Sequence, residues 1–279
     1  MDATEFKRAS RAVWEAMAQG WEDRHAYFEE RARPVAERMI ERLAPTPGQT
    51  ILDVAAGTGV VGFAAAGLVV SDGRVIVSDF SQAMVDAATR RAAELGLVNV
   101  ECRVLDAEQL DLPDDAVDGV LCRCGYMLMA DPKAALNESR RVLCRGGRLS
   151  CAVFGAPEQN PWVALPSKVL HEHGHMPAPD AGAPGILALA DRGRLRRLFV
   201  QAGFSEPHVE EVAFTWRFRD GDDYWAFLTG AALAIAAVVD RLEEDERGRV
   251  REEIVERLRP LYIGEEIELP AVSLVAWAA

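Results

Sequence analysis

The sequence has no excess of basic residues. Its 279 residues include 31 lysines and arginines against 44 aspartates and glutamates, which gives a formal net charge of −13. Surfaces that bind nucleic acid neutralise phosphates with clustered lysine and arginine side chains. A chain this acidic therefore predicts no nucleic acid among its partners.

Long apolar runs and paired cysteines are also missing. No apolar stretch reaches the roughly 18 residues that suggest a membrane span, and the first 17 residues lack the apolar region of a signal peptide. The five cysteines include no C-x-x-C pair, which argues against a zinc or dithiol motif. These absences predict a cytoplasmic protein with free thiols, no membrane span and no metal site.

What the sequence does contain, from residue 50 onward, is an alternation of short β-branched runs with helical patterns. Runs such as "TILDVA", "RVIVSD" and "DGVLCR" are followed by helical segments, with Ser81 and Asp131-Pro132 at two expected helix starts and Gly146-Gly147 at an expected helix end. This order predicts the α/β class, with a doubly wound, mostly parallel Rossmann-like sheet.

Two segments lie outside this alternation and divide the chain. Residues 1–46 carry aromatic side chains at helical spacing and predict an N-terminal helical cover, followed by the Rossmann-like core at residues 47–155. Residues 156–190, rich in Pro, Gly and Ala, are expected to form a lid or substrate loop. The remainder, residues 191–279, completes the core and contains a late helical insertion at about residues 220–260.

The stretch "ILDVAAGTGVVGFAAA" raises the question of a nucleotide ligand. Gly57, Gly59 and Gly62 follow the G-x-G-x-x-G pattern at a predicted turn from strand to helix, and Asp79 ends the next strand about 20 residues later. In dinucleotide sites such a loop binds pyrophosphate and the acid binds ribose. The pattern suits any ligand that contains adenosine, so an NAD-dependent oxidoreductase remains open at this point.

Three further features argue against NAD as the ligand. Asp53 lies four residues before Gly57, where it would repel a pyrophosphate. Asp106 places a third carboxylate at a strand end, within reach of an adenine amino group. The Tyr-x-x-x-Lys pair expected for short-chain hydride-transfer enzymes is missing. The three carboxylates predict a positively charged nucleoside in one cleft.

Four ordered motifs, "LDVAAGTG", "VSDFSQAMVDAA", "DAEQLDLPDDAVDGVLCR" and "DPKAALNESRRVLCRGGRL", resemble those of the class I S-adenosylmethionine (SAM)-dependent methyltransferases. They are most similar to the subgroup of ubiquinone/menaquinone-biosynthesis methyltransferases. The chain departs from that pattern at Cys144-Arg145-Gly146-Gly147, where the family usually has Lys-Pro-Gly-Gly. The resemblance implies a Rossmann-like fold, SAM as the cofactor and methyl transfer as the reaction.

The resemblance also implies a set of cofactor contacts. Gly57 and Gly59 would let the backbone approach the methionine part of SAM, with Asp53 near its amino group. Asp79 would bind the ribose hydroxyls, and Asp106 would contact the adenine edge. The implied contacts are Asp53, Ala55, Gly57, Gly59, Asp79, Phe80, Met84, Asp106, Ala107, Cys122 and Arg123.

The acceptor side is less defined, since methyl transfer mainly requires alignment and only some acceptors need a base. His171 and His173 in "HEHGHMP" are candidate general bases, and a metal is disfavoured there because no carboxylate at ligand spacing accompanies them. The residues expected to line the acceptor pocket are Trp14, Trp21, Tyr27, Tyr126, Met127 and Trp162.

Together these patterns predict SAM-dependent methyl transfer to a small aromatic or quinone-like acceptor, as in secondary metabolism, by C- or O-methylation with N-methylation also open. The alternatives are an NAD-dependent oxidoreductase that uses the same loop and a non-catalytic SAM-binding protein. The expected partner is the small-molecule methyl acceptor. The apolar helix near residues 231–239 also offers a seam for a homodimer.

Overall fold

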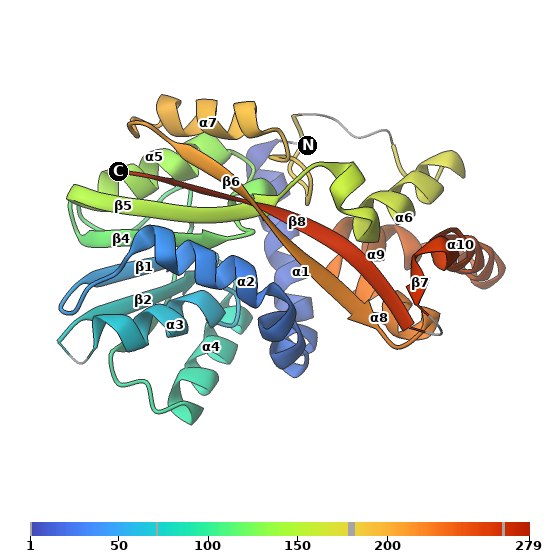
Figure 1. Cartoon of the computed structure of the whole chain (residues 1–279), viewed down its shortest axis with the longest axis horizontal. Helices are drawn as coiled ribbons and strands as arrows, with labels where there is room; N and C mark the ends of the chain where they lie inside the picture. The colour runs from blue at the N-terminus through green and yellow to red at the C-terminus, as the bar shows by residue number, and fades with distance from the viewer. Residues whose placement is uncertain (1, 71, 178–181, 264–265) are drawn as a thin grey trace.

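The computed structural model describes every residue except 1, 71, 178–181 and 264–265, so part of the predicted 156–190 loop lies outside the described residues. Its centre is one sheet in the order β3-β2-β1-β4-β5-β8-β6, with β7 paired to β8 (Figure 1). The strands are β1 (Thr50–Val54), β2 (Arg74–Asp79), β3 (Val100–Val104), β4 (Val117–Arg123), β5 (Leu143–Phe154), β6 (His208–Phe218), β7 (Tyr262–Ile263) and β8 (Glu266–Ala278).

The pairing makes the sheet mostly parallel. Strands β3, β2, β1, β4 and β5 pair in parallel, whereas β8 runs antiparallel between β5 and β6. The strand order reverses between β1 and β4, and open α/β sheets bind ligands at the carboxyl ends of the strands beside such a reversal. The predicted doubly wound fold is confirmed, and it places the glycine loop after β1 at the reversal.

The helices that cross over between these strands are α3 (Val60–Val69), α4 (Gln82–Glu94), α5 (Pro132–Val142) and α7 (Arg192–Gln201). Two of them begin at the predicted capping residues, α4 after Ser81 and α5 after Asp131. The Ser81 side chain accepts from the Met84 N–H at the start of α4, and Asp131 accepts from two backbone N–H groups at the start of α5. Each cap satisfies donors that a helix leaves free in its first turn.

The expected helix end at Gly146-Gly147 is wrong. Helix α5 ends at Val142 and the chain passes directly into β5. The register then shifts, since Leu143 pairs with Val117 while Arg148 pairs with Gly119. Gly146, with φ of +82°, lies in this irregular stretch. The two glycines therefore serve a bulge within a strand, where an extra length of chain needs unusual backbone angles.

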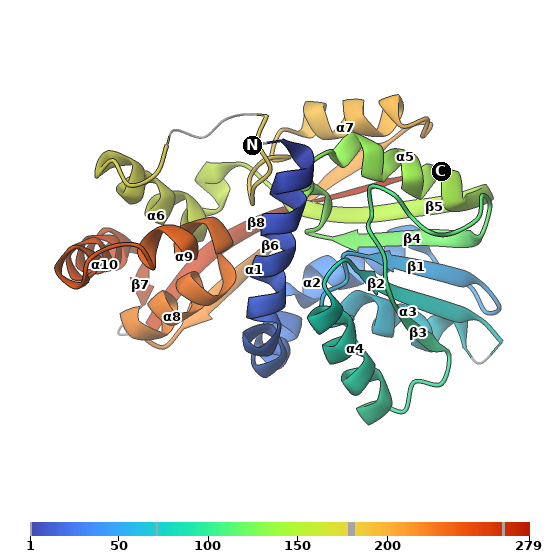
Figure 2. The same ribbon diagram turned by 180° about the vertical axis from the view of Figure 1, so that it is seen from behind.

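The N-terminal cover consists of α1 (Ala3–Asp23) and α2 (His25–Leu43). Helix α2 buries Val35, Met39 and Leu43 in the core. Helix α1 contacts α4 and crosses the molecule between the sheet and the outer helices (Figure 2). The Glu15 carboxylate accepts from the Gln82 and Ala83 N–H groups at 2.7 and 3.0 Å, which ties α1 to the start of α4 just beyond β2.

A second group of helices surrounds the far ends of β6 and β8, and we call it the outer lobe (Figure 1). It comprises α6 (Pro161–Glu172), α8 (Gly221–Ala231), α9 (Leu233–Val239) and α10 (Glu244–Leu258). The late insertion predicted at about residues 220–260 contains three of these helices, with α8 and α9 separated by Ala232. Short 3-10 helices are η1 (Tyr126–Leu128), η2 (Pro157–Gln159) and η3 (Arg259–Leu261).

The outer lobe buries much of its apolar surface within the chain. Ile235 and Val239 of α9 are almost fully buried, so their side chains give no support to a homodimer seam on this helix. Among the described residues, no helix combines the length and the apolar character that crossing a membrane requires.

Candidate cofactor site

The glycine loop turns the chain sharply from β1 into α3. Gly57 and Gly59 have φ of +55° and +86°, in the region that residues with a side chain rarely adopt. Gly62 packs α3 closely on the sheet, because a Cβ there would lie 2.8 Å from Val77 Cγ2 and 2.9 Å from Asp53 Oδ2. The loop thus brings backbone N–H groups and the N-terminus of a helix to the carboxyl end of β1.

Asp53, at the same end of β1, is 1% exposed. Its Oδ2 accepts from the Gly62 N–H at 2.7 Å, while Oδ1 has no hydrogen-bond partner among the described residues. Burial raises the pKa of Asp53 to about 7, partly offset by the Gly62 hydrogen bond and by Arg123. A buried oxygen without a partner is costly, so this carboxylate is suited to a cationic ligand.

Asp79 ends β2 and joins two parts of the site. Its carboxylate accepts from the Gly57 N–H and the Ser81 N–H, both at 3.0 Å. Burial raises its pKa to about 6, and these backbone hydrogen bonds oppose that shift. Because each carboxylate oxygen accepts more than one hydrogen bond, Asp79 retains capacity for ribose hydroxyls.

Asp106 follows β3 and is held by the N-terminal cover. Lys7 Nζ lies 2.6 Å from Asp106 Oδ2 and 3.2 Å from Glu108 Oε2. The three predicted carboxylates thus lie at or just beyond the carboxyl ends of β1, β2 and β3, which are neighbours in the sheet. Lys7 could not be predicted as part of this group, because Asp106 lies 99 residues later in the chain.

The remaining predicted cofactor residues also lie at these strand ends. Met84 is buried in the first turn of α4, and a Cβ added at Gly57 would lie 4.0 Å from its Sδ. The Arg11 guanidinium of α1 lies 5.5 Å from the centroid of the half-buried Phe80 ring. Buried Cys122 and half-buried Arg123 end β4, while Ala55 follows β1 and Ala107 follows β3.

Four of the predicted acceptor residues meet in one aromatic cluster between the N-terminal cover and the outer lobe. Trp14 contacts Trp21, and Tyr27 stacks on Trp216, with ring centroids 5.7 and 6.0 Å apart. Trp162 lies 5.7 Å from Trp216. The aromatic cluster consists of Trp14, Trp21, Tyr27, Phe28, Trp162, Trp216 and Phe227.

Sequence reasoning missed Phe28, Trp216 and Phe227 in this cluster. The available signal was the alternation in "AFTWRF", which places Phe214, Trp216 and Phe218 on one face of β6. The indole N–H groups of Trp21 and Trp216 are buried and have no acceptor among the described residues.

The other two predicted acceptor residues lie after β4. Tyr126 is 1% exposed, and its hydroxyl lies 2.7 Å from the Ser139 hydroxyl of α5. Met127 is also buried, and its carbonyl accepts from the Gly185 N–H at 2.9 Å. These residues connect the end of β4 to α5 and to the segment that follows residue 181.

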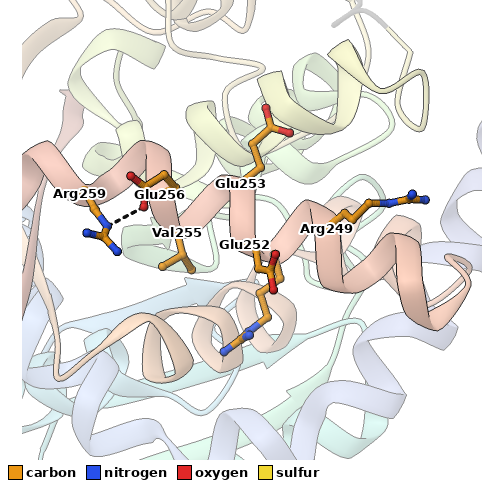
Figure 3. A pocket seen from close by; sticks show the side chains of 7 residues that line it. Arg249, Glu252, Glu253, Val255, Glu256 and Arg259 are labelled. Carbon is orange, nitrogen blue, oxygen red and sulfur yellow. Dashed lines mark ion pairs between the residues drawn. The ribbon is translucent and has the colours of Figure 1, made fainter.

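The candidate bases lie at the end of α6. His171 Nδ1 lies 3.0 Å from the Met176 carbonyl, and His173 Nε2 lies 2.7 Å from Glu253 Oε2 of α10. Their contacts are therefore within the outer lobe, and a role as base remains a prediction. A shallow hollow on α10 is lined by Arg249, Arg251, Glu252, Glu253, Val255, Glu256 and Arg259 (Figure 3), so it is formed by the outer lobe and not by the glycine loop.

Comparisons with known proteins agree with this geometry. The model of the ubiE/COQ5 methyltransferase family matches residues 32–215. A demethylmenaquinone methyltransferase of Clavibacter sepedonicus is 38% identical over 41% of this chain and 45% of its own length. The ubiquinone/menaquinone biosynthesis C-methyltransferase UbiE of Shewanella frigidimarina is 30% identical over 60% of this chain and 70% of its own length.

The fold has solved counterparts as well. A putative methyltransferase from Bacillus halodurans superposes with a TM-score of 0.60 at 20% identity, covering 87% of this chain and 97% of its own. The resemblance drawn from the four motifs is confirmed, together with SAM as the cofactor and a SAM-dependent methyltransferase as the enzyme class, and the NAD-dependent alternative gains no support. Because the family model matches more than half of this chain, the chain belongs to the ubiE/COQ5 methyltransferase family.

Proposed function

We propose that the protein transfers the methyl group of SAM to a small aromatic or quinone-like acceptor, by C- or O-methylation with N-methylation also open. The observation that carries the proposal is the buried Asp53 carboxylate, which accepts from the Gly62 N–H through Oδ2 and whose Oδ1 has no partner among the described residues. An unpaired anionic oxygen is suited to the cationic methionine part of SAM. Asp79, Phe80, Met84 and Asp106 would then hold the adenosine.

The aromatic cluster supports the choice of acceptor. Its rings offer flat apolar surface, and the buried indole N–H groups of Trp21 and Trp216 are donors for carbonyl or hydroxyl oxygens. The names of the Clavibacter and Shewanella relatives indicate that those proteins act in quinone biosynthesis. We propose an acceptor of the same chemical class here, and we propose the cytoplasm as the location because the five cysteines are free thiols.

The test is a turnover assay with methyl-labelled SAM and a panel of naphthoquinols, benzoquinols and phenols. Mass spectrometry should show an acceptor heavier by one methyl group and an equal amount of S-adenosylhomocysteine. SAM binding by calorimetry without product from any quinol would favour the non-catalytic alternative. Binding of NAD without binding of SAM would overturn the proposal.

A further inference from the structure

The fold brings two histidines of "HEHGH" to Glu246, a carboxylate far away in the sequence. His175 Nε2 lies 2.8 Å from Glu246 Oε1, and His173 Nδ1 lies 3.6 Å from the same oxygen. Glu246 is on α10, 71 residues after His175. Two imidazoles and one carboxylate thus meet between the end of α6 and the first turn of α10.

We propose that His173, His175 and Glu246 bind a divalent transition-metal ion, with zinc as the best match. One potential ligand atom from each residue lies within 4.8 Å of the other two. Tetrahedral zinc with bonds of about 2.0–2.2 Å holds its ligand atoms about 3.3–3.5 Å apart. Small side-chain rotations are enough to reach that geometry, and a water molecule would complete the coordination.

The surroundings of His173 support this assignment. Its other ring nitrogen, Nε2, lies 2.7 Å from Glu253 Oε2, about two turns after Glu246 on the same face of α10. A metal-bound imidazole usually donates its second N–H to a carboxylate, which fixes the ring and the tautomer. If His173 donates Nε2–H to Glu253, its Nδ1 carries a lone pair and no proton. Nδ1 and Glu246 Oε1 are then two acceptors 3.6 Å apart that repel each other, and a cation between them would remove this repulsion. In Figure 3 the Glu253 side chain points from α10 toward the helix to which His173 is attached.

The charges nearby are compatible with a bound cation. The Glu246 and Glu253 carboxylates lie within hydrogen-bond distance of His175 and His173, respectively. Arg249 contacts the second oxygen of Glu246 and leaves Oε1 to the histidines. Arg257 likewise contacts the second oxygen of Glu253. Nitrogen and oxygen ligands of this kind suit zinc better than magnesium or calcium.

The three proposed ligands lie at the end of α6 and on α10, and none of them belongs to the predicted cofactor contacts. A metal there would connect α6 to α10, which pack against each other. Its role would be to fix these two helices, since ligands drawn from separate elements make metal binding contribute to folding stability.

The experiment titrates zinc into metal-free, tag-free full-length protein at pH 7.5 by calorimetry. We expect one equivalent to bind, and we expect both His175→Ala and Glu246→Gln to weaken binding by more than about tenfold. His171→Ala is the matched control, because His171 contacts the Met176 carbonyl and not Glu246; its affinity should equal that of the unmodified protein. Cobalt should bind without the charge-transfer band of a thiolate ligand.

Three results would overturn the proposal. They are the absence of saturable zinc binding, equal affinity in all four proteins, and a thiolate band with cobalt, which would move the metal to the cysteines. A thermal-shift assay provides a check on folding, because zinc should raise the melting temperature of the His171→Ala protein but not that of a folded Glu246→Gln protein.

Discussion

Lys7 Nζ lies 2.6 Å from Asp106 Oδ2, so the first helix of the chain is tied to the end of β3. Both side chains are partly exposed, and pairs of this kind contribute at most about 1 kcal/mol to stability. We expect Lys7→Ala to leave global unfolding nearly unchanged while hydrogen exchange in residues 3–23 becomes faster. Arg8→Ala removes the same charge from an exposed position on α1. Equal exchange in the two variants would show that the pair does not hold the helix.

Asp79 is expected to contribute directly to SAM affinity. Its carboxylate already accepts from Gly57 and Ser81, and loss of charge-assisted hydrogen bonds costs on the order of 1–3 kcal/mol. Asp79→Ala should therefore raise the Kd for SAM by roughly 5- to 150-fold in calorimetry. Asp86→Ala, which removes an exposed carboxylate from the neighbouring α4, is the control. An unchanged Kd in a folded Asp79→Ala protein would remove this residue from the site.

The affinity for SAM should increase with pH. Burial raises the pKa of Asp53 to about 7 in the folded protein, against about 3.9 for an unfolded aspartate. The stability that comes from the neutral carboxyl is thus complete below the unfolded pKa and is lost as the pH rises through about 7. A cationic ligand binds the ionised form. Binding should therefore strengthen from about pH 6 to pH 8, with release of protons.

The control for this pH dependence is Asp53→Asn, which cannot ionise. Its Kd for SAM should be higher at pH 8 and should change less with pH than that of the unmodified protein. Asp79, whose pKa burial raises to about 6, contributes a smaller change in the same direction at lower pH. Parallel pH profiles for the two proteins would exclude Asp53 as the titrating group.

Two glycines on α3 should respond oppositely to alanine. A Cβ at Gly62 would lie 2.8 Å from Val77 Cγ2, whereas a Cβ at Gly67 meets nothing within 4 Å. Gly62→Ala should destabilise the protein by about 1–3 kcal/mol through overpacking. Gly67→Ala should stabilise it by about 0.5–1 kcal/mol because alanine favours the helix. Urea unfolding measures both, and equal effects would show that α3 does not pack this closely.

The parallel core was predictable because its signals are local. Most of the strands are short runs rich in β-branched residues, and the starts of α4 and α5 have the capping side chains Ser81 and Asp131. The three acidic strand ends follow from the same pattern, since consecutive strands of an alternating fold end at one edge of the sheet. Gly146-Gly147 misled the prediction because glycines at a helix end and in a strand bulge look alike in sequence.

The contacts between distant segments could not be predicted. Glu246 lies 71 residues after His175 in the sequence and reaches His173 and His175 only because α10 folds back on α6. The pairing of Lys7 with Asp106 likewise depends on how α1 crosses the sheet. The helical spacing of the aromatic residues in the N-terminal segment predicted buried helix faces. The contacts of Tyr27 and Trp162 with Trp216 could not be predicted, because they depend on where β6 lies in the fold.

The last strand has one further consequence. Residues 273–278 of β8 pair with β5, whereas residues 268–272 pair, among the described residues, only with β6, next to the helices that the chain inserts between β6 and β8. We therefore expect that the insertion can change in length or sequence without disturbing the pairing between β5 and residues 273–278 of β8. Because β8 is the strand common to both parts, the inserted helices can change while the strands beside the glycine loop keep their pairing.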